Sequence, residues 1–382
     1  MRQTYYQIMA NTNTALHAAN RNKKDEFYTQ LSDIEKELSH YREYFKDKIV
    51  LCNCDDPYES NFFKYFALNF NALGLKKLMA TCYDGSPISG LELPLFFELE
   101  ENTSPKKVAY KVEITEIPDL DGNGATDLSD VQLLLQSDNN IMQPLTGNGD
   151  FRSAECIELL KQADIVVTNP PFSLFREYVA QLVKFDKKFL IIGNQNSITT
   201  KDLFPLIKDN KIWLGVTMNG SNRWFRVPDD YEMTPSMKIE DGVKYCFVKS
   251  VVWYTNIEHN KRKEELILWR LYSPEEYPHY ENYDAIEVGN VNNIPVDYNG
   301  VIGVPVTFLH KYNPSQFEIL GMCENEDLYQ LKTKVYSSAE CKQAYLDRFG
   351  KRGVYDLNAS GVIITNGKRE KVYSRILIRK KQ

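Results

Sequence analysis

The chain has 382 residues and a formal net charge of −6, and this length can bury a sizeable core in two domains or in one elaborated domain. No apolar run reaches membrane-spanning length and the polar N-terminus lacks a signal-peptide pattern, so we expect a cytoplasmic protein that contacts no membrane. Seven scattered cysteines without a C-x-x-C pair argue against a zinc site or a disulfide framework.

The chain begins with a polar segment, residues 1–22, that predicts a flexible arm. Residues 25–46 then carry apolar side chains at helical spacing, with Ser32 or Asp33 as a plausible N-cap. We therefore expect the folded part of the protein to open with an amphipathic helix.

A β-α-β unit follows this helix. Residues 48–54 and 75–83 predict two buried strands, and residues 60–70 predict the helix that connects them. Such units form parallel sheets, so the unit predicts an α/β fold.

Residues 86–148 interrupt this pattern and are interpreted as an insertion that holds a pair of strands within residues 96–116. The alternation then resumes, with helices predicted at 154–162 and 174–185 and strands at 165–168, 188–193, 211–216 and 244–253. Beyond residue 270 the patterns weaken and indicate loops and short strands, not a second sheet of the same kind.

Charge is unevenly distributed along the chain. Residues 331–382 contain 13 Lys and Arg against 4 Asp and Glu, a net charge of +9, which leaves −15 for the rest. A basic segment on an acidic body is typical of proteins with a nucleic-acid-binding face, and Lys380 is a candidate contact within it. The alternative is an ordinary solvated surface.

The run Asp164–Phe172, which reads DIVVTNPPF, is the most informative stretch of the sequence. A short buried strand ends abruptly at Asn169, because neither following proline can donate to a sheet and each one fixes its own φ. Open α/β sheets bind ligands at this end of their strands. The amide of Asn169, the carbonyl of Pro170 and the ring of Phe172 suit a planar heterocycle with an exocyclic amino group.

The loop after the first strand has no glycine-rich pattern. It reads NCDDP over residues 53–57, and its two aspartates would repel a pyrophosphate. Asp55 suits instead the positive charges and hydroxyls of S-adenosylmethionine, and Asp84, which ends the second strand, is placed to accept hydrogen bonds from its ribose. Either aspartate is alternatively a plain turn residue.

A second carboxylate lies beside an aromatic residue at Asp150 and Phe151, just before the helix that leads to the Asn169 strand. This pair can hydrogen-bond the edge of a base and pack against its ring. The alternative role of Asp150 is in the N-cap region of that helix.

Residues 119–130 match the calcium-loop template at positions 1, 3, 5, 6 and 9, with Asp in place of Glu at position 12. The candidate oxygen ligands are Asp119, Asp121, Asn123, Asp127 and Asp130. A strand and not a helix is predicted before the loop, so a bound calcium ion would be structural. An acidic surface loop without an ion is the alternative.

Residues 220–226 mix aromatic and cationic side chains. Arg223, Trp224 and Arg226 can enter a DNA groove and contact base edges. A β-hairpin with a buried tryptophan explains the same residues without DNA.

Six segments together resemble the EcoRI-type adenine-specific (N6) DNA methyltransferases, and they extend over nearly the whole chain. They are DEFYTQ at 25–30, NCDDPYESNFFKY at 53–65, GDFRSAECIELLKQADIVVTNPP at 149–171, FLIIGN at 189–194, GVPVTFLHKYNPSQF at 303–317 and RILIRKK at 375–381. The resemblance implies a class I, Rossmann-like methyltransferase fold with a mostly parallel sheet. It also implies S-adenosylmethionine as methyl donor and an adenine in duplex DNA as acceptor.

Roles for single residues follow from the resemblance. Asn169, Pro170 and Phe172 match the catalytic corner, and the residues that match the donor-binding motifs are Phe27, Tyr28, Thr29, Asp55, Asp84, Asp150 and Phe151. The chain lacks the glycine-rich first loop of amino-methyltransferases at large, as the family also does.

The expected organisation is a catalytic core at residues 23–200, with the insertion 86–148, followed by the remaining core strands, a target-recognition region and the basic C-terminus at 201–382. The expected function is methylation of N6 of a flipped-out adenine in a specific duplex sequence, in a bacterial or phage restriction-modification system or as a solitary methylase. We expect a monomer, without a stable complex with any cognate endonuclease. Methylation of RNA adenine or protein glutamine, or DNA binding by an inactive core, are the alternatives.

Overall fold

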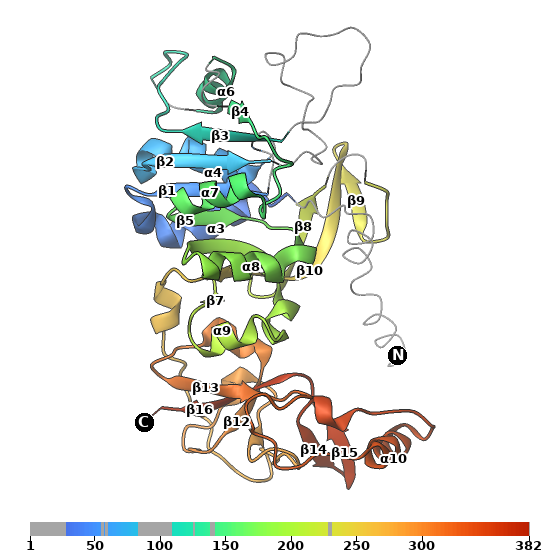
Figure 1. Ribbon diagram of the computed structural model, residues 1–382. Coiled ribbons are helices and arrows are strands. Elements are labelled where there is room, and N and C mark those ends of the chain that lie inside the picture. Colours follow the sequence, from blue (N-terminus) through green and yellow to red (C-terminus); the bar gives the residue numbers. More distant parts are fainter. Residues whose placement is uncertain are drawn as a thin grey trace. The chain divides into compact units, whose positions relative to one another are not determined.

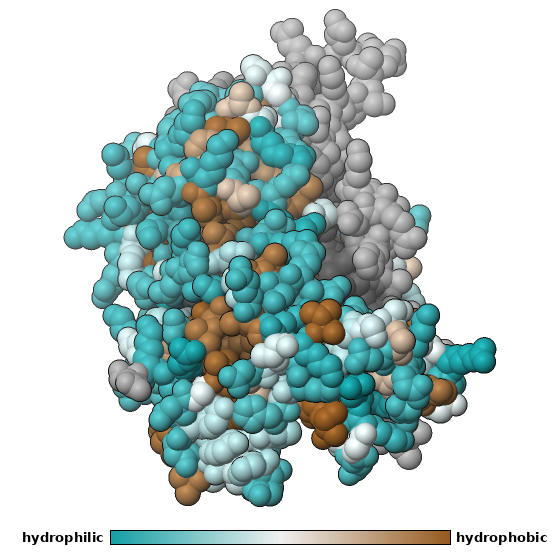
Figure 2. Space-filling view, turned by 60° about the horizontal axis from the view of Figure 1, so that its bottom comes forward, coloured by the Kyte–Doolittle hydropathy of each residue, from teal (hydrophilic) through white to brown (hydrophobic). Residues whose placement is uncertain are grey.

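The computed structural model describes residues 28–54, 57, 60–82, 109–124, 127–137, 142–227 and 231–381, so the predicted arm lies outside the described residues. The chain divides into two compact units (Figure 1). The first contains the described residues up to Ser197 together with Leu214–Ile257, and the second contains Ile198–Trp213 and the residues from Glu258 onward. Hydrophilic side chains predominate on the face drawn in Figure 2. No helix in the described ranges is long and apolar enough to cross a membrane.

A ten-stranded mixed sheet forms the centre of the first unit, in the order β4-β3-β2-β1-β5-β6-β10-β7, with β8 and β9 also paired to β10. The strands are β1 (Ile49–Asn53), β2 (Lys77–Thr81), β3 (Tyr110–Ile114), β4 (Met142–Pro144), β5 (Ile165–Thr168), β6 (Lys188–Asn194), β7 (Trp213–Leu214), β8 (Ser221–Arg226), β9 (Met237–Glu240) and β10 (Val243–Thr255). The pairs β2–β1, β1–β5 and β5–β6 are parallel.

The prediction of a mostly parallel sheet is wrong outside this centre. Strands β3 and β4 come from the predicted insertion and extend the sheet beyond β2 by antiparallel pairing. Strand β10 is antiparallel to β6, β8 and β9. A parallel neighbour requires a crossover that brings the chain back to the same end of the sheet, whereas these segments enter from the opposite end.

Both faces of the parallel centre are buried, which explains the unbroken apolar runs that predicted these strands. Figure 1 shows helices on both sides of the sheet, with α7 and α8 in front of it. The helices of the first unit are α3 (Leu31–Leu38), η1 (Ser39–Phe45), α4 (Asn61–Leu68), α5 (Phe70–Leu73), α6 (Leu128–Ser137), α7 (Ala154–Gln162), η2 (Phe172–Leu174), α8 (Phe175–Lys184) and η3 (Gln195–Thr199). Gly193 of β6 allows α8 to approach, because a Cβ there would lie 2.6 Å from the Phe175 ring.

The first helix is confirmed, but its start differs from the prediction. It begins at Leu31, with Gln30 at the N-cap position and no side-chain cap hydrogen bond, so neither Ser32 nor Asp33 is the cap. The reason is tertiary: Tyr28 forms a β-bridge with Arg226, which keeps the chain extended up to this point.

A buried carboxylate joins this helix to the segment that follows β7. Glu37 is 0% exposed, and it accepts hydrogen bonds from the backbone N–H groups of Val216 (2.7 Å) and Thr217 (2.6 Å) and from the Tyr41 hydroxyl (3.0 Å). These two backbone groups bind Glu37 instead of a neighbouring strand. The predicted strand at 211–216 is therefore reduced to Trp213–Leu214.

The second unit contains a four-stranded sheet in the order β11-β12-β16-β13 and a two-stranded β14–β15 hairpin. Only the β11–β12 pair is parallel among these strands. The elements are α9 (Phe204–Lys208), η4 (Asn260–Lys263), β11 (Ile286–Glu287), η5 (Val291–Asn293), β12 (Ile302–Pro305), η6 (Val306–Lys311), β13 (Phe317–Met322), α10 (Ser338–Phe349), η7 (Leu357–Ala359), β14 (Val362–Thr365), β15 (Lys368–Lys371) and β16 (Arg375–Lys380). The sequence predicted loops and short strands here; the strands are short, but they form a sheet of their own, and the helix α10 was not predicted.

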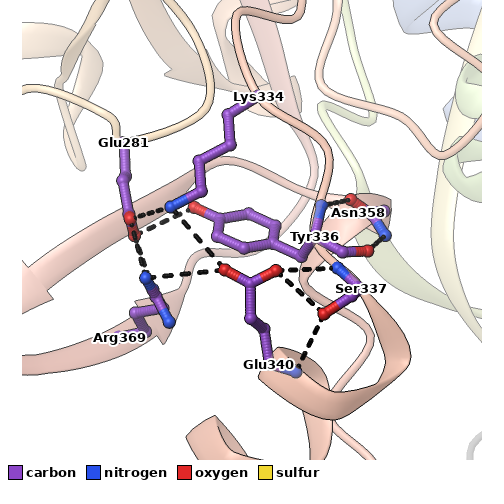
Figure 3. Close-up of polar contacts among 7 residues, drawn as sticks. All are labelled: Glu281, Lys334, Tyr336, Ser337, Glu340, Asn358 and Arg369. Carbon is purple, nitrogen blue, oxygen red and sulfur yellow. Dashed lines mark hydrogen bonds and ion pairs between the residues drawn. The ribbon is translucent and has the colours of Figure 1, made fainter.

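Glu281 connects three segments of the second unit (Figure 3). Its carboxylate accepts hydrogen bonds from the Arg369 guanidinium at 2.7 and 2.9 Å, from the Tyr336 hydroxyl at 3.1 Å and from the Lys334 ammonium. The hydrogen bonds from Arg369 are the main cause that lowers the pKa of Glu281 to about 2. The charged form of Glu281 therefore stabilises this part of the fold.

Replacing Glu281 by Gln keeps the shape of the side chain but removes its charge. We expect the variant to lose about 1–3 kcal/mol of unfolding free energy near neutral pH, because Arg369 and Lys334 lose their nearest carboxylate and keep only longer contacts with Glu340, at 3.8 and 3.9 Å. Since the pKa of Glu281 falls from 4.5 to about 2 on folding, this contribution is complete above the higher value and is lost as the pH falls toward the lower one.

Urea unfolding of both proteins at about pH 7 and about pH 3.5 measures this effect. The difference in unfolding free energy between wild type and Glu281→Gln should be smaller at the lower pH. The variant Glu265→Gln, at an exposed position, should differ little from wild type at either pH. An equal difference in unfolding free energy at both pH values would contradict the stabilising role of the charged Glu281 side chain.

Candidate active site

The Asn169 corner has the geometry that its prolines predict. Strand β5 is buried along its whole length and is followed by Asn169, which is 6% exposed, and by buried Pro170. A 3-10 turn starts at Phe172, and the backbone N–H of Leu174 donates to the Pro171 carbonyl at 3.0 Å. The chain thus turns sharply at the carboxyl end of a central strand.

Asn53 ties this strand to the end of β1. Its backbone carbonyl accepts a hydrogen bond from the Thr168 hydroxyl, and its side-chain oxygen accepts one from the Tyr178 hydroxyl of α8. All three residues are buried. The start of the first loop and the Asn169 corner therefore share one buried hydrogen-bonded frame.

The first loop leaves β1 through an unusual backbone conformation. Cys54 has a φ of 77°, in the left-handed region that normally favours glycine. A cysteine thus adopts a backbone conformation that glycine adopts without strain. Strained backbone of this kind clusters at functional sites.

Tyr28 and Thr29 are brought to the same end of the sheet by long-range contacts. The backbone of Tyr28 exchanges two hydrogen bonds with that of Arg226 in β8, at 2.9 and 3.2 Å. The Thr29 carbonyl accepts a hydrogen bond of 2.7 Å from Asn61, the first residue of α4. Thr29 is 2% exposed, and its hydroxyl oxygen has no hydrogen-bond partner among the residues that the structure describes. Such a buried hydroxyl can serve a ligand.

Asp150 and Phe151 also lie in this neighbourhood. The Phe151 ring packs edge-on against Tyr178, with 5.0 Å between the ring centroids. The Asp150 carboxylate forms hydrogen bonds of 2.9 and 2.6 Å with the Arg152 guanidinium, which lower the pKa of Asp150. Ser153 is the N-cap of α7, and Asp150 lies in the N-cap region, where its carboxylate also accepts a hydrogen bond from the Arg152 N–H at 2.8 Å.

Phe225, which the sequence placed only in the aromatic and cationic segment 220–226, packs at the corner. Phe225 of β8 is 1% exposed, and its ring lies edge-on to Phe172 with 6.4 Å between centroids. Side chains alternate along a strand, so Phe225 points away from the face that carries Trp224 and Arg226. This alternation is visible in the sequence, but the identity of its partner is not.

The predicted DNA-contacting residues have different surroundings. Arg223 lies on the Phe225 face of β8, with its Nε 3.4 Å from the Asp33 carboxylate. Trp224 is half-buried on the other face, beneath the Lys238 ammonium at 4.8 Å from its ring centroid. Lys380 belongs to the second unit, where its ammonium donates to the Val296 carbonyl. The predicted residues Phe27, Asp55 and Asp84 lie outside the described residues.

The acidic loop forms a compact oxygen cluster. Asp119, Asp121 and Asp130 each offer a carboxylate oxygen within 4.8 Å of the others. Asp130 is buried and accepts backbone hydrogen bonds from Leu120 (2.6 Å) and Asp127 (2.9 Å). None of the three carboxylates forms an ion pair with a described Lys or Arg, so their mutual repulsion is uncompensated by a cationic side chain.

The chain is similar to known proteins along most of its length. A family model described as "Adenine-specific methyltransferase EcoRI" matches residues 15–381. Type II methyltransferase M.EcoRI of Escherichia coli is 50% identical over 320 residues, which cover 83% of this chain and 91% of that protein. Type II methyltransferase M.MpnI of Mycoplasma pneumoniae is 37% identical over 332 residues, or 84% of this chain and 91% of that protein.

A third relative, Type II methyltransferase M.MgeORF184P of Mycoplasma genitalium, is 34% identical over 376 residues, which are 96% of this chain and 100% of that protein. No solved structure matches the chain. The family model and the relatives show that the chain is a methyltransferase. The chain belongs to the EcoRI-type family of adenine-specific methyltransferases, whose substrate is DNA and whose donor is S-adenosylmethionine.

Replacing Tyr178 by Phe tests the buried frame of the site. The ring and its contact with Phe151 remain, but the side-chain oxygen of Asn53 loses its donor. We expect the unfolding free energy to fall by about 1–3 kcal/mol, the usual cost of a buried polar group without its partner. Urea unfolding measures it, with Tyr44→Phe, at an exposed position, as the matched control. An equal loss in both variants would exclude this role of the Tyr178 hydroxyl.

Proposed function

We propose that this enzyme methylates N6 of an adenine that has left the helix of a specific duplex DNA sequence, as part of a restriction-modification system or as a solitary methylase. The carrying observation is the rigid Asn169 corner, with Phe172 and Phe225 beside it, at the carboxyl ends of parallel strands. Ligand sites of open α/β sheets lie at this edge.

The strand order supports a class I, Rossmann-like fold for the catalytic core. Parallel strands β2, β1, β5 and β6 form the centre, and antiparallel β10 lies between β6 and β7. Residues 86–148 are an inserted element, and the region from residue 201 onward contributes the last core strands and target recognition. The basic C-terminus belongs to this DNA-recognition region.

The donor site lies around the end of β1 in this proposal. The buried Thr29 hydroxyl is available to a polar ligand, and Tyr28, Asp150 and Phe151 surround the same frame. Phe27, Asp55 and Asp84 join this set by their motif positions alone. When bound, S-adenosylmethionine supplies an electrophilic methyl group on a positively charged sulfur.

The corner can activate a poor nucleophile without a general base. The lone pair of the adenine amino nitrogen is delocalised into the ring. The Asn169 side-chain oxygen and the Pro170 carbonyl accept hydrogen bonds from the amino group, which favours a pyramidal nitrogen and opposes the positive charge that develops on it. Phe172 stacks on the ring and sets its plane, so positioning supplies much of the acceleration. Extrusion of the base costs a few kcal/mol, which contacts with the DNA backbone offset.

Replacing Asn169 by Ala removes one of these two acceptors. We expect the single-turnover rate of methyl transfer to fall by about 10²–10³-fold, the usual cost of losing such an electrostatic contact, with binding of donor and DNA little changed. Exposed Asn325→Ala is the control and should retain its activity.

A tritiated-methyl assay on duplex DNA, duplex RNA and protein measures the rate and compares the possible acceptors. Near-normal transfer by Asn169→Ala would remove this residue from the mechanism. Labelling of RNA or protein in place of DNA would favour an RNA-adenine or protein-glutamine methyltransferase, and absence of transfer by wild type would favour a DNA-binding regulator.

The proposal also covers the contacts with DNA, the oligomeric state and the cognate endonuclease. The proposed DNA contacts are Trp224 and Arg226 on one face of β8, Arg223 on its other face, and Lys380 of the second unit. The enzyme acts as a monomer in the bacterial or phage-infected cytoplasm, because one adenine per strand requires no two-fold symmetry of the protein. A cognate endonuclease acts on the same site without a stable complex.

The loop at residues 119–130 is proposed to bind one structural calcium ion. Its side-chain oxygens follow the calcium-loop template, and its clustered carboxylates lack a cationic side chain as partner. The proposed ligands are Asp119, Asp121, Asn123, Asp127 and Asp130.

Titration calorimetry tests this site directly. We expect one calcium ion per chain and a rise in melting temperature, because the ion binds the folded state alone. Asp119→Asn should abolish both effects, while the control Asp241→Asn should retain them. No heat of binding at millimolar calcium would show that the loop is an acidic surface turn.

A further inference from the structure

A small helix–hairpin module, residues 336–372, stands out within the second unit. It consists of α10, η7 and the β14–β15 hairpin, and α10 packs against β15 (Figure 1). The module has its own hydrophobic cluster, formed by Tyr336, Cys341, Ala344, Leu357 and Val362. It can therefore present a surface of defined shape.

Residues 281 and 282 hold the module in place. Glu281 binds Arg369 and Tyr336, as Figure 3 shows. The neighbouring Asn282 is fully buried, donates to the Ser360 carbonyl at 2.9 Å and accepts from the Val362 N–H at 2.9 Å. The module is thus fastened through charged and neutral hydrogen bonds, and its outward side chains are carried on a fixed frame.

All four carboxylates of the module are engaged within the protein. Glu340 closes the capping box of α10 with Ser337, and Glu370 pairs with Arg348 at 2.6 Å. Asp356 accepts a hydrogen bond from the Asn358 N–H at 3.1 Å, and Asp347 accepts one from Gln343 at 2.6 Å.

The cations of the module fall into two groups. Arg348, Arg369 and Lys371 have partners inside the protein. Exposed cations without a side-chain partner in the described part of the chain are Lys342, Lys351, Arg352 and Lys368. The solvent-exposed surface of the module therefore carries an excess of positive charge over the negative charge of its own carboxylates.

The fold gathers three of these cations at one end of the module. Gly350, with a φ of 67°, ends α10 and is followed at once by Lys351 and Arg352. Lys368 follows a tight hairpin turn and lies on the same face of β15 as Glu370. Glu370 binds Arg348 in the last turn of α10, so this face of β15, which also carries Lys368, faces the C-terminal end of α10.

Aromatic packing stiffens the segment that carries Lys351 and Arg352. The ring of Phe349 lies 4.7 Å from that of Tyr345 and 5.9 Å from that of Tyr355, between centroids. A Cβ at Gly353 would overlap the Tyr345 ring, so the chain passes directly over this aromatic cluster. Lys342 lies about two turns earlier on α10, roughly 10 Å from the helix end.

We propose that Lys342, Lys351, Arg352 and Lys368 form a phosphate-binding surface that holds the backbone of duplex DNA. The proposal rests on the proposed function, since DNA is the expected substrate. Mobile cationic heads on a fixed frame suit a regular array of phosphates and carry no information about base sequence. The surface supplies binding that is common to all duplexes and helps to offset the cost of extruding the target base.

The test compares the triple variant Lys351→Gln/Arg352→Gln/Lys368→Gln with wild type in duplex binding at several salt concentrations. We expect the slope of log affinity against log salt to become shallower by about 0.9 for each lost phosphate contact, and affinity to fall about tenfold or more. The loss should be equal for target and unrelated duplexes. Methyl transfer at saturating DNA should stay near the wild-type rate. The matched control carries Lys36→Gln, Lys48→Gln and Lys76→Gln, three exposed lysines of the first unit, and should bind as wild type does.

An unchanged slope, or a loss confined to the target sequence, would overturn the proposal. Asp347→Asn adds positive charge to the module without touching its core and should strengthen binding to every duplex, which keeps the test decisive if the triple variant folds poorly. Weaker binding of Asp347→Asn would also count against the surface. Failure of the proposed function looks different, because wild type itself would then not methylate duplex DNA.

Discussion

The carboxyl end of β1 is held by one buried asparagine, and the arrangement of the site depends on it. Asn53 accepts hydrogen bonds from Thr168 through its backbone and from Tyr178 through its side chain. These bonds connect β1, β5 and α8 through buried residues, so breaking one leaves a buried polar group unsatisfied. The start of the first loop and the Asn169 corner are thereby held next to each other by the same buried residues.

Strand β10 extends this frame to the aromatic side of the site. Its second half pairs with β6, and its first half carries β8 and β9. The pairing of β8 with β10 continues across a register shift between Val248 and Val251. Strand β8 then brings Phe225 against Phe172 and pairs through Arg226 with Tyr28. Three parts of the chain that are far apart in sequence therefore meet at the corner.

The second unit uses its cations in two ways. Some of them form hydrogen-bonded ion pairs that stabilise the fold, as Arg375 does with Glu287 and Arg369 with Glu281. Others remain in solvent. The net charge of +9 over residues 331–382 thus overstates the positive charge available to a partner, because a charge that is already paired attracts phosphate only weakly. Lys380, predicted as a DNA contact, already donates to a backbone carbonyl.

The sequence by itself determined the local elements and the chemistry at their ends. Helix Ala154–Gln162, the short strand before Asn169 and the turn that follows it all arise from periodicity and from the fixed φ of proline, which act over a few residues. Only the tertiary structure decided the antiparallel direction of β3 and β10, the start of the first helix at Leu31 and the place of Phe225 beside Phe172. These features depend on which distant segments come into contact, and no local pattern encodes the partner.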